Sequence, residues 1–180
     1  MSIFPEKNVP QCEEILGYQF NDKSLCASAL NASGTNHILH GTIIKPNKRL
    51  ATYGDTAMTQ LMCAKWLDTD RTLGDWADIR STTLASKNLG EIGTSAGIDK
   101  AAVFSGGTTT VSDKMMASVV QAIMGAVHLD AGMHAEQVLG TAMSKIGLEN
   151  SLLQPESAGI STETGGLGQG QNGQDRGKSA

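Results

Sequence analysis

The chain has 180 residues, a net charge of −4 and only 4% aromatic residues. This length suits one domain of about 150 residues with a tail, and an apolar content rich in Ala, Leu, Ile and Met favours packed helices over sheets. The negative charge argues against strong non-specific attraction to nucleic acid, although a local basic patch remains compatible with it. No segment predicts a membrane span, a secretory signal or a mitochondrial targeting sequence, so we expect an intracellular protein, cytoplasmic or nuclear, that does not associate with membranes.

The first third of the chain predicts two short helices and a loop. Helices are predicted over Pro10–Leu16 and from residue 21 to about residue 30, where apolar residues recur at helical spacing. Residues 31–47 lack periodicity and predict a loop, with short apolar stretches at 38–39 or 43–44. We interpret His37 and His40 as solvated histidines and not as metal ligands, because the sequence places no third ligand near them.

A long, mostly buried helix is predicted next, running from the cap residue Asn47 to Trp66. It contains Gly54, and a glycine inside a helix costs about 1 kcal/mol relative to alanine. Such a glycine indicates that another element approaches the helix backbone closely. Asp55 would lie beside that contact, and a carboxylate in a partly buried place needs a partner.

The second half of the chain predicts further helices after Thr72, after Ser86, from about Ser112, and over residues 134–146. The helix from Ser112 is the most apolar and is predicted to lie near the centre of the fold. From about residue 150 the composition becomes rich in Gly, Gln and Ser. We therefore divide the chain into an N-terminal extension (1–10), a helical domain (11–149) and a disordered tail (150–180).

Several segments resemble the ribonuclease III family. Residues 48–55, Lys-Arg-Leu-Ala-Thr-Tyr-Gly-Asp, resemble its signature Glu-Arg-Leu-Glu-Phe-Leu-Gly-Asp. Residues 16–20 before it, and residues 79–81 and 117–130 after it, match other segments of the family in the same order. The resemblance spans about residues 11–148. It implies an all-α, ribonuclease III-like helical domain that works as a dimer and cuts double-stranded RNA with Mg²⁺.

The resemblance also places the family's four metal-binding carboxylates on this chain. The matching residues are Ala51, Asp55, Ser118 and Gln121, of which only Asp55 is charged. Mg²⁺ requires oxygen ligands whose charge compensates its dehydration, so Asp55 alone is not expected to suffice as a metal site, and no cofactor is expected. We interpret the site as a former catalytic centre kept as a structural hub. The alternative is one Mg²⁺, held by Asp55 and substrate phosphates, that supports slow cleavage.

Four basic residues are candidates for contacts with RNA phosphates: Lys48, Arg49, Arg80 and Lys114. Their alternative interpretation is an ordinary solvated surface. The family's dimer uses an aromatic plug where this chain has Thr52, which has too little apolar volume for that contact. The resemblance still implies a homodimer, or a complex with another partner through the same face, but the residue at the plug position does not support it.

Three functions remain open from the sequence. The first is a catalytically impaired pseudo-nuclease that acts in RNA binding or processing or as a dimerising scaffold. The second is an active, Mg²⁺-dependent endoribonuclease that cuts double-stranded RNA. The third is a structural protein of a large ribosomal subunit, as degenerate members of the family are in mitochondria.

Overall fold

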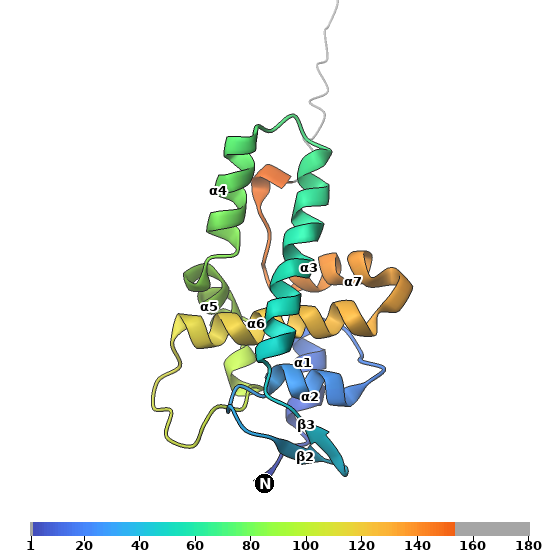
Figure 1. The fold of residues 1–180 in the computed structure, drawn as a ribbon, viewed down its shortest axis with the longest axis vertical. Helices are drawn as coiled ribbons and strands as arrows, with labels where there is room; N and C mark the ends of the chain where they lie inside the picture. Colours follow the sequence, from blue (N-terminus) through green and yellow to red (C-terminus); the bar gives the residue numbers. More distant parts are fainter. Residues whose placement is uncertain (1, 154–180) are drawn as a thin grey trace, which may run out of the picture.

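The computed structural model describes residues 2–153, which form seven α-helices and one three-stranded sheet (Figure 1). The helices are α1 (Asn8–Leu16), α2 (Lys23–Leu30), α3 (Lys48–Leu67), α4 (Leu73–Thr83), α5 (Ser86–Ser95), α6 (Asp113–Asp130) and α7 (Ala135–Lys145). The strands are β1 (Ser2–Ile3), β2 (His37–Leu39) and β3 (Thr42–Ile44), and three 3-10 turns occur at η1 (Ile98–Lys100), η2 (Gly132–His134) and η3 (Ser151–Leu153). The predicted all-α class is confirmed, with a small sheet added. The predicted tail lies outside the described residues from position 154 onward.

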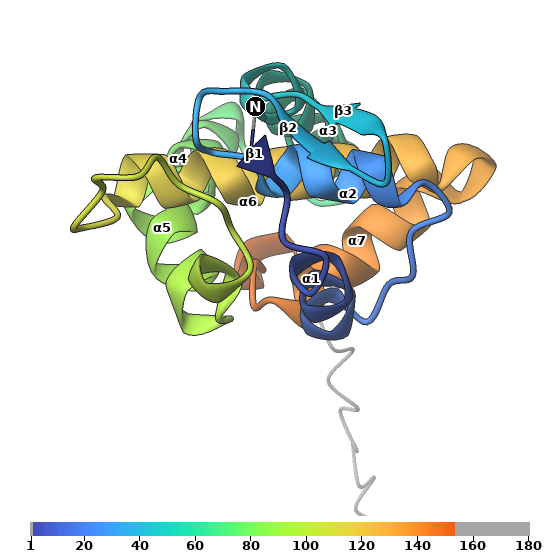
Figure 2. The same ribbon diagram turned by 90° about the horizontal axis from the view of Figure 1, so that it is seen from below.

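Helix α6 forms the centre of the domain, as its sequence predicted. The other helices are arranged around it (Figures 1 and 2), and the six consecutive residues 122–127 are all buried. A helix that is apolar on every side can be stable in water only when protein surrounds it. The core continues into neighbouring helices through side chains with no exposed surface, such as Leu30, Met58 and Leu139.

Helices α3 and α4 form a hairpin that extends away from the rest of the domain (Figure 1). Thr72 begins α4 with a capping box, in which its side chain accepts a hydrogen bond from the Asp75 backbone and the Asp75 carboxylate accepts one from the Thr72 backbone. Leu67 and Leu73, on either side of the turn, are 70% and 75% exposed. The tip of the hairpin therefore presents apolar surface to solvent.

Residues 31–47 differ from the predicted loop, because they contain the hairpin β2–β3. The two strands pair antiparallel, and β1 joins the other side of β2 in a parallel arrangement (Figure 2). The turn between β2 and β3 uses His40 and Gly41 at positive φ, 47° and 81°. Strands of two or three residues are too short to leave a periodic pattern, which is why the sequence did not predict them.

The interpretation of His37 as a solvated histidine is wrong, whereas His40 is exposed as expected. His37 is 7% exposed, and its two ring nitrogens each lie 2.8 Å from a serine hydroxyl, Ser2 Oγ at Nδ1 and Ser33 Oγ at Nε2. The imidazole therefore joins β1, β2 and the preceding loop. It acts as a structural histidine with its hydrogen bonds satisfied.

Asn47 precedes α3, but its side chain does not cap that helix as predicted. The side chain is buried, and its Nδ2 donates a hydrogen bond to the carbonyl oxygen of Ala29 at 3.2 Å. Asn47 thus ties the start of α3 to the end of α2.

No helix within residues 2–153 combines the length and the apolar composition needed to cross a membrane.

Candidate functional site

Two glycines bring the backbones of α3 and α6 into direct contact. A Cβ atom added to Gly54 would lie 1.8 Å from the carbonyl oxygen of Gln121, and one added to Gly125 would lie 2.6 Å from the carbonyl oxygen of Leu50. Neither helix can carry a side chain at the crossing point. The close approach predicted from Gly54 is confirmed, and its partner is the central helix.

The crossing places Asp55 beside Gln121. The Nε2 atom of Gln121 donates a hydrogen bond to Oδ1 of Asp55 at 2.9 Å, in a partly buried position. Ser118, one turn earlier on α6, donates instead to the carbonyl oxygen of Lys114 at 3.0 Å, and Ala51 is buried beside the crossing. The structure therefore brings two of the four predicted positions into a bonded pair.

These residues do not fit a magnesium site. They offer one carboxylate, one amide already bonded to it, and one hydroxyl bonded to its own helix. Throughout residues 2–153, no three His, Cys, Asp or Glu side chains are grouped so that they could hold a metal ion. Mg²⁺ bound to protein relies on carboxylates to compensate its charge, and this pair supplies a single negative charge.

The four predicted basic residues are all exposed. Lys48 and Arg49 lie on the first turn of α3, Arg80 lies on α4, and Lys114 lies on the first turn of α6. The ion pairs within residues 2–153 involve none of them. Their charges are therefore available to an anionic partner, and Arg80 is the one that shares a groove with Asp55.

That groove, of about 660 Å³, lies between α3 and α4. One wall is the stripe of α3 residues at i, i+4 spacing, Asp55, Thr59, Cys63 and Leu67, and the opposite wall includes Trp76 and Arg80 from α4. The Trp76 ring packs on Trp66 with the ring centroids 5.7 Å apart. The side-chain hydroxyl of Thr59 is buried without a hydrogen-bond partner within residues 2–153. The sequence did not predict this groove, although it contains the four-residue spacing of these side chains along α3.

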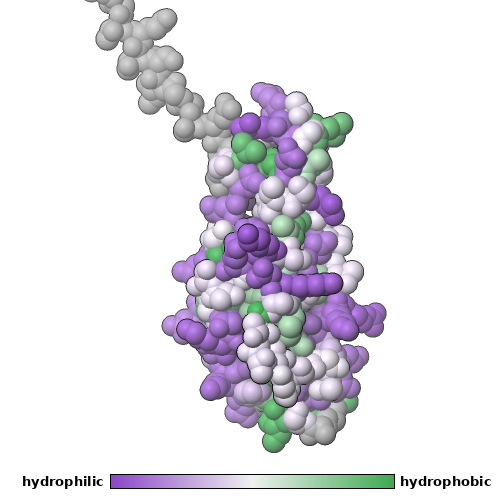
Figure 3. Space-filling model, turned by 90° about the vertical axis from the view of Figure 1, so that its left-hand side faces the viewer, coloured by the Kyte–Doolittle hydropathy of each residue, from purple (hydrophilic) through white to green (hydrophobic). Residues whose placement is uncertain are grey.

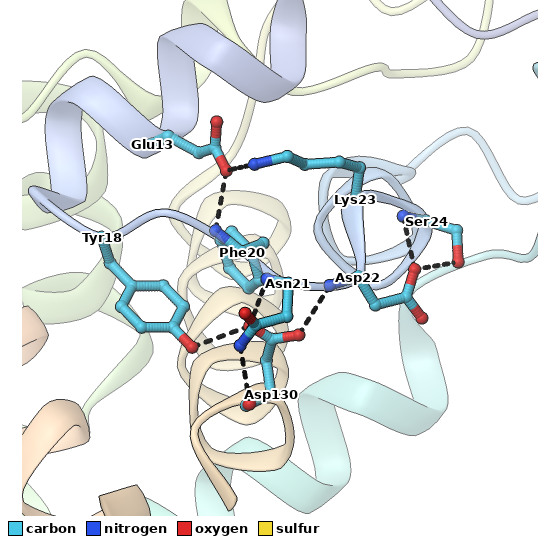
Figure 4. A network of polar contacts seen from close by, with 8 residues as sticks. All are labelled: Glu13, Tyr18, Phe20, Asn21, Asp22, Lys23, Ser24 and Asp130. Carbon is cyan, nitrogen blue, oxygen red and sulfur yellow. Dashed lines mark hydrogen bonds and ion pairs between the residues drawn. The ribbon is translucent and has the colours of Figure 1, made fainter.

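A second carboxylate, Asp130 at the end of α6, has a different environment from that of Asp55 on α3 (Figure 4). Asp130 accepts hydrogen bonds from the Tyr18 hydroxyl at 2.7 Å and from the backbone N–H groups of Asn21 and Asp22 at 2.7 and 2.9 Å. Burial by itself would raise the pKa of Asp130, but these hydrogen bonds outweigh it and lower the pKa below its ordinary value. Burial, followed by the hydrogen bond to Asp130 and its charge, raises the pKa of Tyr18. Asp130 thus fixes the α1–α2 connection to the end of the central helix.

Comparison with known proteins supports the fold and the family resemblance. No family model matches the chain. Ribonuclease 3 of Rhodopirellula baltica is 30% identical over 131 residues, which cover 69% of this chain and 47% of that protein. Ribonuclease 3 of Shewanella sediminis is 32% identical over 136 residues, which cover 71% of this chain and 56% of that protein.

A solved structure of the nuclease domain of ribonuclease III from Campylobacter jejuni superposes with a TM-score of 0.64 at 22% identity and covers 77% of this chain and 95% of that domain. This chain contains a ribonuclease III-like domain. It spans about half the length of the curated relatives that it matches. The domain therefore shares sequence with the two curated relatives and its fold with the solved nuclease domain, and the bonded pair of Asp55 and Gln121 lies within it.

Proposed function

We propose that this ribonuclease III-like domain does not cleave RNA but binds it or assembles on it. The observation that carries the proposal is the hydrogen bond between Gln121 Nε2 and Asp55 Oδ1, 2.9 Å long. An amide donor occupies the carboxylate that a metal ion would need. The site satisfies its own polar groups, as a structural hub does.

The chemistry of phosphodiester cleavage supports this reading. A bound metal ion in such a site would activate water and neutralise charge on the phosphate. Ala51 contributes a methyl group, Ser118 a hydroxyl bonded to Lys114, and Gln121 a neutral amide. With one carboxylate among four positions, affinity for Mg²⁺ should be too low for the ion to be retained at cellular concentration.

Binding to double-stranded RNA is supported by the exposed cations on α3, α4 and α6. Lys48, Arg49, Arg80 and Lys114 are exposed and lie outside the ion pairs of the described residues. Each contact between such a side chain and a phosphate releases counterions, so the affinity should fall steeply with salt. The overall charge of −4 predicts weak binding outside this surface.

A dimer, or a complex with another protein, is supported by the groove between α3 and α4. Its apolar residues continue into the exposed Leu67 and Leu73 at the hairpin tip. Apolar groups of this kind lose contact with water when a second helical surface covers them. Thr52, where an aromatic plug was expected, is exposed and donates to its own helix at Lys48, so the groove is the better candidate for the interface.

Cleavage and binding of RNA are tested separately with the purified chain. Long duplex RNA is incubated with the protein in Mg²⁺ or Mn²⁺, and in parallel the protein is titrated with the same duplex at several salt concentrations. We expect no Asp55-dependent products and a salt-sensitive affinity that falls about tenfold or more in the Arg80→Ala, Lys114→Ala double variant. Cleavage that disappears in Asp55→Asn would show an active endoribonuclease. If the protein does not bind the duplex, or binds it with an affinity that does not depend on salt, RNA is not the partner.

A further inference from the structure

The small sheet carries a row of isoleucines on its outer face. Ile3 of β1 pairs with Ile38 of β2, which pairs with Ile43 of β3, and paired residues point to the same side of a sheet. Ile3 is 79% exposed and Ile43 is 54% exposed. Phe4, which follows β1, and Ile44, the last residue of β3, have no exposed surface and belong to the core.

This row lies far from the tip of the α3–α4 hairpin. Figure 1 places the strands at the lower end of the molecule and the hairpin tip at the upper end, and Figure 3 shows apolar groups at both ends. The row therefore belongs to neither the Asp55 site nor the groove beside it.

The charge beside the row is positive. Lys45 follows β3 directly. Along residues 43–45 the side chains are exposed, buried and exposed in turn, which is the alternation expected when Lys45 lies on the same side as Ile43. Lys45 is exposed and takes part in no ion pair within residues 2–153. At the opposite end of the hairpin, Nδ1 of the exposed His40 lies 3.7 Å from Oε1 of Glu6.

We propose that this isoleucine row and Lys45 dock an acidic segment of a partner protein. Its apolar side chains would cover Ile43 and its neighbours, and its carboxylates would pair with Lys45. A second copy of this chain fits less well for two reasons. Three isoleucines can bury on the order of 300 Å², whereas a stable dimer buries about 800 Å² on each partner, and the second copy would bring another Lys45 into the same small interface. An RNA duplex fits less well because the three isoleucines offer no hydrogen-bond donor or positive charge to its phosphates, and Lys45 alone supplies one charge.

The test uses the full chain and two labelled ten-residue peptides, one of alternating leucine and glutamate and one of alternating leucine and lysine. We expect the glutamate peptide to bind at least tenfold more tightly than the lysine peptide in fluorescence anisotropy. Ile43→Ser should weaken that binding at least tenfold, and Lys45→Glu should reverse the preference between the peptides. Met133→Ser is the matched control, because Met133 is 98% exposed and distant in sequence from the sheet.

Spectra of isoleucine methyl groups locate the contact. We expect the glutamate peptide to shift the methyl signals of Ile3, Ile38 and Ile43 and to leave those of the core isoleucines in place. Equal affinity for the two peptides, or unchanged affinity in Ile43→Ser, would overturn the proposal. The proposal would also be overturned if the methyl signals of the row shifted when the protein concentration was raised, or when an RNA duplex was added, but not when the peptide was added. If Ile43→Ser lowers the thermal midpoint, Lys45→Glu still decides the question, since Lys45 is exposed.

Discussion

Two carboxylates next to the central helix, Asp55 and Asp130, have opposite environments. Asp130 accepts hydrogen bonds from the Tyr18 hydroxyl, from two backbone N–H groups and from the Asn21 side chain. Asp55 accepts one side-chain hydrogen bond, from the amide of Gln121. Asp130 is therefore a structural anion that the fold depends on. Asp55 occupies a position set by backbone packing, where its own charge contributes little.

The largest loss of stability is expected when the packing that positions Asp55 is disturbed. In Gly54→Ala the new Cβ would meet the carbonyl oxygen of Gln121 at 1.8 Å, so α3 and α6 would have to separate. We expect a loss of about 4 kcal/mol or more in the free energy of unfolding, or failure to fold. Urea unfolding followed by circular dichroism measures it. Gly106→Ala is the control, because open space surrounds Gly106 and the change should stay within about 0.5 kcal/mol.

The next effect concerns Asp130. Asp130→Ala leaves the Tyr18 hydroxyl and the N–H groups of Asn21 and Asp22 without their acceptor, and we expect a loss of about 2–3 kcal/mol at pH 7. Asp70→Ala is the matched control, since that exposed carboxylate makes no hydrogen bond within the described structure, and its cost should be near zero.

The same carboxylate predicts how stability depends on pH. The folded pKa of Asp130 is lowered, so the unfolded chain binds the proton more readily. Its contribution is complete above the unfolded pKa of about 3.9 and disappears as the pH falls through the folded value. Unfolding curves between pH 7 and pH 2 should therefore converge for the parent chain and Asp130→Ala. A difference that stays constant over this range would contradict the assignment.

A smaller effect is expected when a second negative charge is placed beside Asp55. Gln121→Glu replaces the donor of the hydrogen bond with a carboxylate, and we expect a cost of about 1 kcal/mol at pH 7 from repulsion at a partly exposed site. A more stable Gln121→Glu variant at pH 7 would mean that a cation is held there.

The smallest effect is expected for Asp55 itself. Asp55→Asn keeps the shape of the side chain and an oxygen that can accept from Gln121, so the free energy of unfolding should change by less than about 0.5 kcal/mol. Thermal unfolding of the two proteins side by side measures this. A loss similar to that of Asp130→Ala would show that the two carboxylates have the same structural role.

The sequence predicted the helices whose apolar residues recur at a regular spacing along the chain. The long helix α3, the buried helix α6 and the backbone contact at Gly54 all follow from helical spacing and from one glycine in an unfavourable place. The pairing of Asp55 with Gln121 followed only from the resemblance, because the two residues lie 66 positions apart.

What the sequence could not predict depends on short elements and distant partners. The strands β2 and β3 have three residues each, and the Asp130 network joins residues more than 100 positions apart. Asn47 is a residue type that often caps helices, yet tertiary packing directs its side chain to the carbonyl oxygen of Ala29. In each case a long-range contact determines the role, and local propensity carries no information about it.

We propose that the amide of Gln121 occupies the place that a metal ion would need at Asp55. Isothermal titration of the purified chain with Mg²⁺ tests it most directly, with the variant Ala51→Glu, Ser118→Asp, Gln121→Glu measured in parallel. We predict no saturable binding to the parent chain up to about 10 mM and measurable binding to the variant, because it restores three carboxylates around Asp55. Sub-millimolar binding of Mg²⁺ to the parent chain that disappears in Asp55→Asn would contradict the account.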